Sequence, residues 1–269
     1  MVAAFLLVSG ALIALACLPL LSPLLPRREN YARRAIPTAA GIIFLPIILV
    51  SIMIWLLFTG SGMEGGGLAF LAYGLLAGLA GFADDVWGGT QERGFRGHLG
   101  ALARGRVTTG LVKVVALVGG ALAVGGHLFG MSAAAVYAGF LLAGSTNAAN
   151  LFDLRPGRAG KFAGLATISV AFLAPGEAVL AVLPVVGGAV VLFKFDVRGR
   201  IMLGDTGAAV LGAVPGYLVV ACGPGVVWAV AGVVILALTV VAEFSSISRV
   251  IEEVGALRWF DLWGRGADE

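Results

Sequence analysis

The positively charged residues of this chain are confined to alternate gaps between its apolar stretches. All 18 lysines and arginines fall in, or at the edge of, every second gap, and the gaps around residues 60–67, 125–131, 174–177 and 222–225 contain none. Short basic loops of polytopic membrane proteins stay on the cytoplasmic side. The pattern therefore predicts a helical membrane protein with one charged, cytoplasmic face and one nearly bare outer face.

The composition agrees with this class. The mean hydropathy is +1.01, and 12% of the residues are charged, whereas about a quarter are charged in soluble domains. A helix needs roughly 20 apolar residues to cross the hydrocarbon core. We expect an all-α polytopic integral membrane protein with about nine transmembrane helices, near residues 2–25, 38–59, 67–83, 109–126, 131–149, 162–174, 177–193, 206–222 and 225–244.

The first apolar segment sets the predicted orientation. Its cations, Arg27 and Arg28, follow it instead of preceding it, which is typical of an uncleaved anchor with its N-terminus outside. An odd number of crossings then leaves the C-terminus in the cytoplasm. We expect a transmembrane domain at 1–244 and a cytoplasmic amphipathic segment at 245–269, where Trp259 and Trp263 favour a membrane interface.

The net charge of +3 does not indicate nucleic acid, because the cations are spread over short loops that face lipid headgroups or phosphate-rich substrates. Cys17 and Cys222 form no disulfide or metal motif. His98 and His127 are predicted on opposite sides of the membrane, so they cannot share a ligand site.

Adjacent carboxylates stand at the inner end of the third apolar segment, where Asp84 and Asp85 follow Gly81-Phe82-Ala83. Two neighbouring aspartates repel each other near hydrocarbon, so keeping both ionised requires a cation or a wet site. A solvated helix end is the alternative interpretation.

Two further acidic motifs lie on the same predicted face. Asn147, Asn150 and Asp153 share one side of a helix at the inner end of the fifth segment, although a helix cap followed by a turn would explain them too. Asp205 opens the eighth segment, where it can serve as a helix N-cap or help to bind an anion.

Together the motifs indicate phosphoryl-transfer chemistry more strongly than each does alone. Aspartate oxygens are ligands for Mg²⁺, and nearby cations bind phosphate. The aspartates are Asp84, Asp85, Asp153 and Asp205, and the cations beside them are Lys113, Arg155, Arg158 and Lys161.

At these motifs the sequence resembles the polyprenyl-phosphate N-acetylhexosamine-1-phosphate transferase superfamily (glycosyltransferase family 4), from about Arg33 to Arg249. Residues 36–41 are similar to its Pro-Thr-x-Gly-Gly segment, 81–85 to its Asp-Asp motif, and 94–98 and 108–113 to its first long cytoplasmic loop. Residues 147–153 match the first half of Asn-x-x-Asn-Leu-x-Asp-Gly-x-Asp-Gly, and 203–208 match Gly-Asp-x-Gly-Ser except at the last residue. Glu243 and Ser246 resemble a Glu-x-x-Ser motif near the inner end of helix nine.

The chain also departs from the family pattern. After Asp153 it continues Leu154-Arg155-Pro156-Gly157, so the second aspartate of the motif is absent. The family's histidine-rich loop and tenth span are missing as well, since no histidine follows His127. We therefore identify a divergent, C-terminally short relative, and we hypothesise that Arg155 and Arg158 supply charge in place of those histidines.

The resemblance implies transfer of a sugar-1-phosphate from a UDP-sugar to undecaprenyl or another polyprenyl phosphate, with release of UMP, at the cytoplasmic membrane. It implies Mg²⁺ (or Mn²⁺) at Asp205 with help from Asp84 and Asp85, all three being catalytic. The expected substrate-binding residues are Lys113, Asn147, Asn150, Asp153, Arg155 and Arg158. An N-acetylhexosamine or MurNAc-peptide donor, a role in cell-wall or surface-glycan synthesis, and a homodimer would fit the same family.

Three other functions compete with this one. A CDP-alcohol phosphatidyltransferase needs Asp-x-x-Asp-Gly, but Pro156 stands three residues after Asp153. A transporter would place its acids near the membrane midplane, whereas these crowd one face. An inactive homologue that binds lipid or acts as a scaffold is the third, motivated by the missing histidines and aspartate.

Overall fold

The computed structural model describes residues 1–30, 33–59, 65–88 and 100–265. Every apolar segment predicted from the sequence overlaps one helix of 14 residues or more, which confirms the all-α fold class. These helices are α1 (Val2–Leu21), α2 (Phe44–Thr59), α3 (Gly66–Trp87), α5 (Thr109–Phe129), α6 (Ala133–Phe152), α7 (Arg158–Ala171), α8 (Gly176–Asp196), α9 (Gly204–Ala221) and α10 (Val226–Phe244). The short elements are the 3₁₀ turns η1 (Ser22–Leu24) and η2 (Ala40–Ile43), the helices α11 (Ile247–Glu253) and α12 (Gly255–Leu262), and an antiparallel hairpin of β1 (Arg27–Glu29) and β2 (Ala35–Pro37).

Among the residues that the structure describes, seven helical segments are long and apolar enough to cross a membrane: Val2–Leu24, Ala40–Leu57, α3, α5, α8, α9 and α10. The protein is therefore a multi-pass membrane protein. Helix α7 has 14 residues and so extends about 21 Å at 1.5 Å per residue, less than the hydrocarbon thickness. That α6 and α7 add two further crossings stays a prediction.

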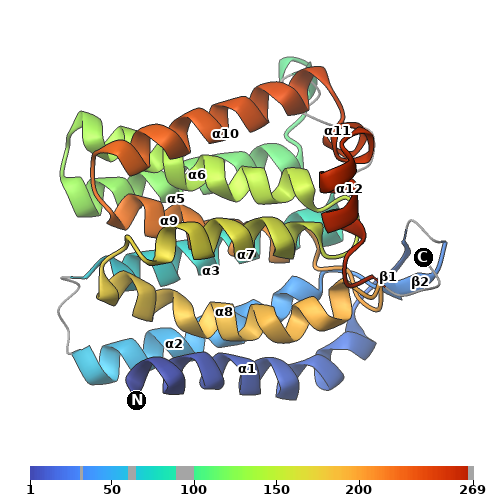
Figure 1. Ribbon diagram of the computed structural model, residues 1–269, viewed down its shortest axis with the longest axis horizontal. Helices are drawn as coiled ribbons and strands as arrows, with labels where there is room; N and C mark the ends of the chain where they lie inside the picture. The colour runs from blue at the N-terminus through green and yellow to red at the C-terminus, as the bar shows by residue number, and fades with distance from the viewer. Residues whose placement is uncertain (31–32, 60–64, 89–99, 266–269) are drawn as a thin grey trace.

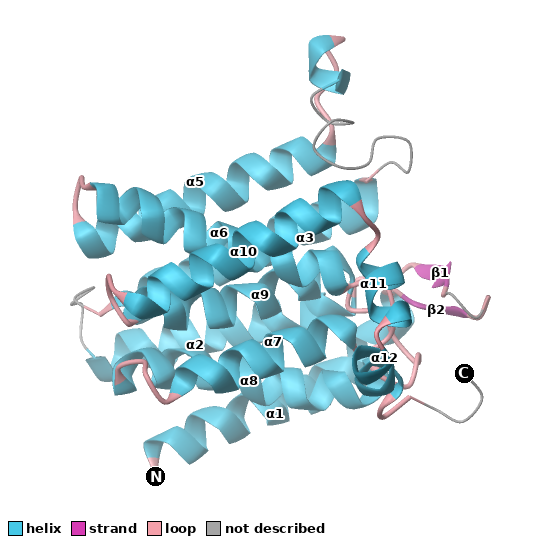
Figure 2. Ribbon diagram, turned by 45° about the horizontal axis from the view of Figure 1, so that its top comes forward, coloured by secondary structure: helices cyan, strands magenta, loops and turns pink. Residues whose placement is uncertain are grey.

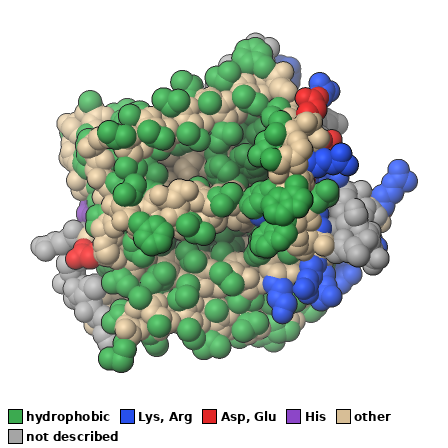
Figure 3. Space-filling model, viewed as in Figure 1, with side chains coloured by type: hydrophobic (Ala, Val, Ile, Leu, Met, Phe, Trp, Pro, Cys, Tyr) green, Lys and Arg blue, Asp and Glu red, His purple; other side chains and the backbone are tan. Residues whose placement is uncertain are grey.

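The long helices run side by side along the long axis of the molecule, and α11, α12 and the β1–β2 hairpin lie together at one end of the bundle (Figure 1; Figure 2). Lysine and arginine side chains gather at that same end in the surface view (Figure 3). Helix α1 begins at the opposite end. The separation of charge predicted from the sequence is thus present in the fold, while the assignment of the basic end to the cytoplasm remains a prediction.

Helix α9 occupies the centre of the bundle. In its apolar window 78% of the residues are buried, compared with 17% in α10, and it packs against α3, α6 and α7. Close packing depends on small residues: a Cβ on Gly212 would lie 2.7 Å from the Ser145 carbonyl oxygen on α6. The N-terminus of α9, which carries Asp205, is consequently fixed from several sides.

The Pro-Thr-Ala-Ala-Gly segment before α2 holds the start of α9. The N–H groups of Ala40 and Gly41 donate to the carbonyls of Met202 and Leu203, both at 3.0 Å, and the Met202 N–H donates to Pro37 at 2.8 Å. A Cβ on Gly41 would meet the backbone nitrogen of Gly207 at 2.1 Å. The motif therefore holds residues 202–207 in place through backbone hydrogen bonds and close packing.

Candidate functional site

The carboxylate of Asp85, on α3, caps the N-terminus of α9. Its Oδ1 accepts the Asp205 N–H at 2.9 Å, while its Oδ2 accepts the Thr206 N–H at 3.0 Å and the Thr206 hydroxyl at 2.5 Å. The first N–H groups of a helix lack partners within the helix and carry partial positive charge. Asp85 satisfies them from another helix and so fixes the position of Asp205.

Of the two alternatives for Asp205, the one in which its side chain caps α9 is therefore wrong. The cap position is Leu203, and Asp205 lies inside the first turn, because Asp85 supplies the carboxylate that a capping residue would otherwise provide. Between them Gly204 has φ +70°, and a Cβ there would lie 2.6 Å from Asp85 Oδ2. Only glycine suits both this left-handed backbone and the close carboxylate. Because Asp85 caps the helix, the side chain of Asp205 does not cap it and contacts Lys113 instead.

Lys113 joins the other two acids of the predicted catalytic set. Its Nζ lies 3.0 Å from Asp84 Oδ2 and 2.9 Å from Asp205 Oδ2, with the ammonium side chain only 13% exposed. The Thr109 hydroxyl donates to Asp84 Oδ1 at 2.6 Å. The structure thus brings Asp84, Asp205 and Lys113, from three helices, into one ionic cluster next to the Asp85 cap.

A cavity of about 230 Å³ opens beside this cluster. Four aspartates are among its lining residues, Asp85, Asp153, Asp196 and Asp205. Its remaining lining residues are Asn30, Thr38, Leu154, Arg155, Pro156, Met202 and Gly204. Residues from four sequence motifs that are far apart in the chain therefore meet at one cavity, at the end of the bundle where the cations gather.

Asp196, which ends α8, is an acidic residue of the cavity that sequence reasoning missed. It belongs to no recognised motif and follows a long apolar run, so the sequence carried no local signal for it. Its side chain is 3% exposed, and its Oδ2 accepts the Gly157 N–H at 3.0 Å. The chain lacks the second aspartate of the family motif after Asp153, yet a second carboxylate faces the same cavity from another helix.

Asp153 follows the last turn of α6 as its C-cap residue. Burial, and then repulsion from Asp196 and Asp205, raises the pKa of the Asp153 carboxyl well above its ordinary value. A cavity that holds such a group, surrounded by further carboxylates, is suited to a cation or to a donor of hydrogen bonds.

The two amides of the predicted polar stripe lie outside the described lining of this cavity. Asn147 is exposed on α6, whereas Asn150 is partly buried, and its Oδ1 has no hydrogen-bond partner among the described residues. The predicted loop motif at Gly94–His98 lies outside the residues that the structure describes.

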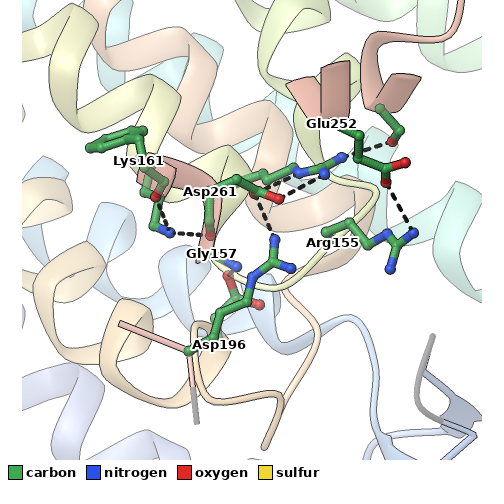
Figure 4. Close-up of polar contacts among 10 residues, drawn as sticks. Arg155, Gly157, Lys161, Asp196, Glu252 and Asp261 are labelled. Carbon is green, nitrogen blue, oxygen red and sulfur yellow. Dashed lines mark hydrogen bonds and ion pairs between the residues drawn. The ribbon is translucent and has the colours of Figure 1, made fainter. Parts of the chain in front are cut away.

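The two arginines proposed to replace histidines have different surroundings (Figure 4). Arg155 lines the cavity and its Nη2 lies 3.4 Å from Glu252 Oε1 at the surface. Arg158 is 4% exposed and forms a two-pronged ion pair with Asp261, at 2.7 and 2.8 Å. Arg155 therefore belongs to the cavity wall. Arg158 is paired with Asp261 and is not among the residues described as lining the cavity.

No three of the described histidine, cysteine, aspartate and glutamate side chains are grouped so as to hold a metal ion. Asp84 and Asp205 share Lys113 instead, and both oxygens of Asp85 accept hydrogen bonds. Mg²⁺ commonly uses one or two carboxylates, with substrate phosphates and water as its remaining ligands. The carboxylates facing the cavity meet that smaller requirement.

The family model described as glycosyl transferase family 4 matches residues 67–223. That range contains the Asp84–Asp85 pair, Lys113, the 147–153 motif and Asp205, so the cluster and most of the cavity lie within the matched part. A search of curated proteins finds no match to the chain.

Proposed function

The chain belongs to glycosyl transferase family 4, and from that premise we propose that it transfers a sugar-1-phosphate from a UDP-sugar to polyprenyl phosphate at the cytoplasmic membrane face. The proposed products are UMP and a lipid-linked sugar for cell-wall or surface-glycan synthesis. The observation that carries the proposal is the cluster in which Lys113 bridges Asp84 and Asp205 beside a carboxylate-lined cavity.

The proposed reaction joins two anions. An oxygen of the lipid phosphate attacks the sugar-side phosphorus of the UDP-sugar, a new P–O bond forms, and the bond from that phosphorus to the bridging oxygen breaks. The bridging oxygen leaves with UMP. Because both reactants are negatively charged, alignment and charge neutralisation supply most of the catalysis.

We assign different tasks to the two aspartates of the cluster, Asp84 and Asp205, and to the capping Asp85. Asp205 would hold the metal ion that neutralises the diphosphate, because its side chain is 35% exposed and the residue lines the cavity. Asp84, held by Thr109 and Lys113, is the proposed neighbour of the attacking phosphate. Asp85 orients Asp205 through its cap on α9. Lys113 keeps Asp84 and Asp205 together and is available to steady a phosphate.

Mg²⁺ (or Mn²⁺) is the proposed cofactor, with Asp205 and one carboxylate from Asp153 or Asp196 as its protein ligands. When bound, it would neutralise charge on the diphosphate. The donor sugar and uridine are assigned to the same cavity, against Asp153, Arg155 and the neighbouring amide Asn150.

A second cavity is the proposed site of the polyprenyl tail. It measures about 400 Å³ and is lined mainly by apolar side chains of α7, α8, α9 and α12. Leu203 lines this apolar cavity, whereas its neighbour Gly204 lines the carboxylate-rich one. An isoprenoid chain held there would direct its phosphate toward the start of α9.

The test is release of UMP by purified protein with undecaprenyl phosphate and Mg²⁺. The donors to compare are UDP-GlcNAc, UDP-GalNAc, UDP-MurNAc-pentapeptide and an unmodified UDP-hexose, with Asp205→Asn as the control variant. Release with one donor that disappears in Asp205→Asn is the expected result. Folded protein that releases UMP with none of them would favour a lipid-binding homologue without activity.

A further inference from the structure

The C-terminal helices α11 and α12 are fastened to the wall of the carboxylate-rich cavity by buried polar contacts (Figure 4). Asp261 is 6% exposed, and its carboxylate receives the two-pronged contact from Arg158 and a 2.6 Å contact from Arg265. Lys161 Nζ donates to the carbonyls of Phe260 and Asp261, at 2.9 and 2.7 Å. One aspartate of α12 is thus the centre of a buried ionic network.

The network includes Arg158, which closely follows the chain segment that lines the cavity. Arg158 is the first residue of α7, and the residues just before it, Asp153 to Pro156, line the cavity. Arg158 N–H donates to the Arg155 carbonyl at 3.2 Å, so a shift of Arg158 would be transmitted to Arg155. From the other side, Asp196 holds the Gly157 N–H.

Helix α12 contacts α7 through buried charged groups, in addition to the apolar cavity that Phe260 and Trp263 line. Its acid points inward to Arg158, whereas Trp259 and Trp263 are 69% and 58% exposed. Aromatic residues on the outer side of an amphipathic helix suit a membrane interface. The helix is therefore held by charge on one side and is available to the lipid interface on the other.

We infer that Asp261 is a positioning residue: through its buried pair with Arg158 it fixes residues 153–157, and with them Asp153 and Arg155, at the donor side of the site. This inference rests on the proposed function only where it concerns donor binding. Arg158 accordingly holds the residues that line the cavity without lining it itself. Arg155, which lines the cavity, is the arginine proposed to contact the substrate.

The matched pair of variants is Asp261→Asn and Glu253→Gln. Both remove one negative charge from the C-terminal segment, but Glu253 is exposed on α11. Ser248→Ala is a milder third variant, because it removes only the 2.7 Å contact from Arg158 Nη1 to the Ser248 hydroxyl. It keeps the inference testable if Asp261→Asn does not fold.

The first measurement is hydrogen–deuterium exchange of residues 154–158. We expect about tenfold faster exchange in Asp261→Asn, a smaller increase in Ser248→Ala, and no change in Glu253→Gln. Unchanged exchange of this loop in Asp261→Asn, or equal changes in Asp261→Asn and Glu253→Gln, would overturn the inference.

The second measurement separates positioning from a general loss of structure. In Asp261→Asn we expect the KM for the UDP-sugar to rise about tenfold, with kcat changed less than about threefold, because the wall binds donor while the cluster on α3, α5 and α9 is untouched. An unchanged KM would overturn the link to donor binding. If the wild-type protein transfers no sugar-1-phosphate, the proposed function fails, and the exchange experiment still decides the role of Asp261.

Discussion

Thr206 on α9 donates both its backbone N–H and its hydroxyl to one oxygen of Asp85 on α3, at 3.0 and 2.5 Å. The two residues are 121 positions apart in the chain. A helix N-terminus is usually capped by a residue next to it in sequence. Here the second aspartate of the Asp-Asp motif does this from another helix, so the two motifs form one structural unit in this chain.

Removing the cap should lower both stability and activity. In Asp85→Ala the N–H groups of Asp205 and Thr206 lose their acceptor, at a cost of about 1–3 kcal/mol in the free energy of unfolding, and Asp205 loses its fixed position. Thermal unfolding in detergent and UMP release should both fall. An Asp85→Ala protein with wild-type melting temperature and turnover would contradict this role.

Gly204 should tolerate no side chain, because its φ is +70° and a Cβ would lie 2.6 Å from Asp85 Oδ2. We expect Gly204→Ala to lower the melting temperature and the rate. Gly119→Ala is the matched control, since a Cβ at that position on α5 has no atom within 4 Å, and alanine is favoured over glycine in a helix by about 1 kcal/mol. Equal behaviour of the two variants would refute the steric argument.

Lys113→Met should reduce kcat/KM at least about tenfold, because it leaves two partly buried carboxylates, Asp84 and Asp205, without their shared cation. Lys113→Arg should retain more activity, since it keeps the charge but changes the geometry. The comparison is made by steady-state kinetics at equal detergent and lipid concentration. Wild-type kinetics in Lys113→Met would show that the ammonium group is dispensable.

Removal of divalent cations should abolish transfer. Treatment with EDTA is expected to stop UMP release, and Mg²⁺, or Mn²⁺ in its place, is expected to restore it, because four aspartates line the cavity and would repel a diphosphate unless a cation is bound between them. Isothermal titration of Mg²⁺ into wild-type protein and Asp205→Asn, each with UDP-sugar, tests the ligand directly. Equal Mg²⁺ affinity in the two proteins would remove Asp205 from the metal site.

The pair between Asp261 and Arg158 should make one part of the stability depend on pH. Burial opposes ionisation of Asp261, but hydrogen bonds and charge from Arg158, followed by Arg265 and Lys161, hold the pKa of Asp261 below its ordinary value. A lowered carboxyl pKa adds stability that is full above the unfolded value of about 3.9 and is lost as the pH falls through the folded value.

The melting temperatures of wild-type protein and Asp261→Asn should therefore differ by a constant amount from pH 8 to about pH 5, and the difference should shrink toward pH 3. A gap that stays the same down to pH 3, or widens there, would show that the ionised carboxylate of Asp261 is not what holds α12.

Much of this architecture follows from periodic hydropathy and charge. Long apolar runs have few ways to fold in lipid other than as helices, so the long helices were predictable within a few residues. The motifs at Asp84–Asp85 and Asp205 also indicated one shared site, because all of them stand at helix ends on the same predicted face.

The parts that sequence reasoning missed depend on contacts between distant residues. Nothing local marks Asp196 as a cavity residue or Asp261 as the partner of Arg158, because each pairing joins helices that only the tertiary fold brings together. The cap on α9 illustrates the same limit: the sequence suggested Asp205 from its position, whereas the fold places Asp85 there.

In the proposed reaction the phosphate attached to the sugar moves with it to the lipid. The most direct measurement uses a UDP-sugar labelled with ³²P at the sugar-side phosphate, incubated with undecaprenyl phosphate, Mg²⁺ and purified protein, and then extracted into organic solvent. We predict that the label enters the lipid fraction, that unlabelled UMP forms in equal amount, and that Asp205→Asn transfers neither. Label that remains in water-soluble UDP while sugar reaches the lipid would contradict the account.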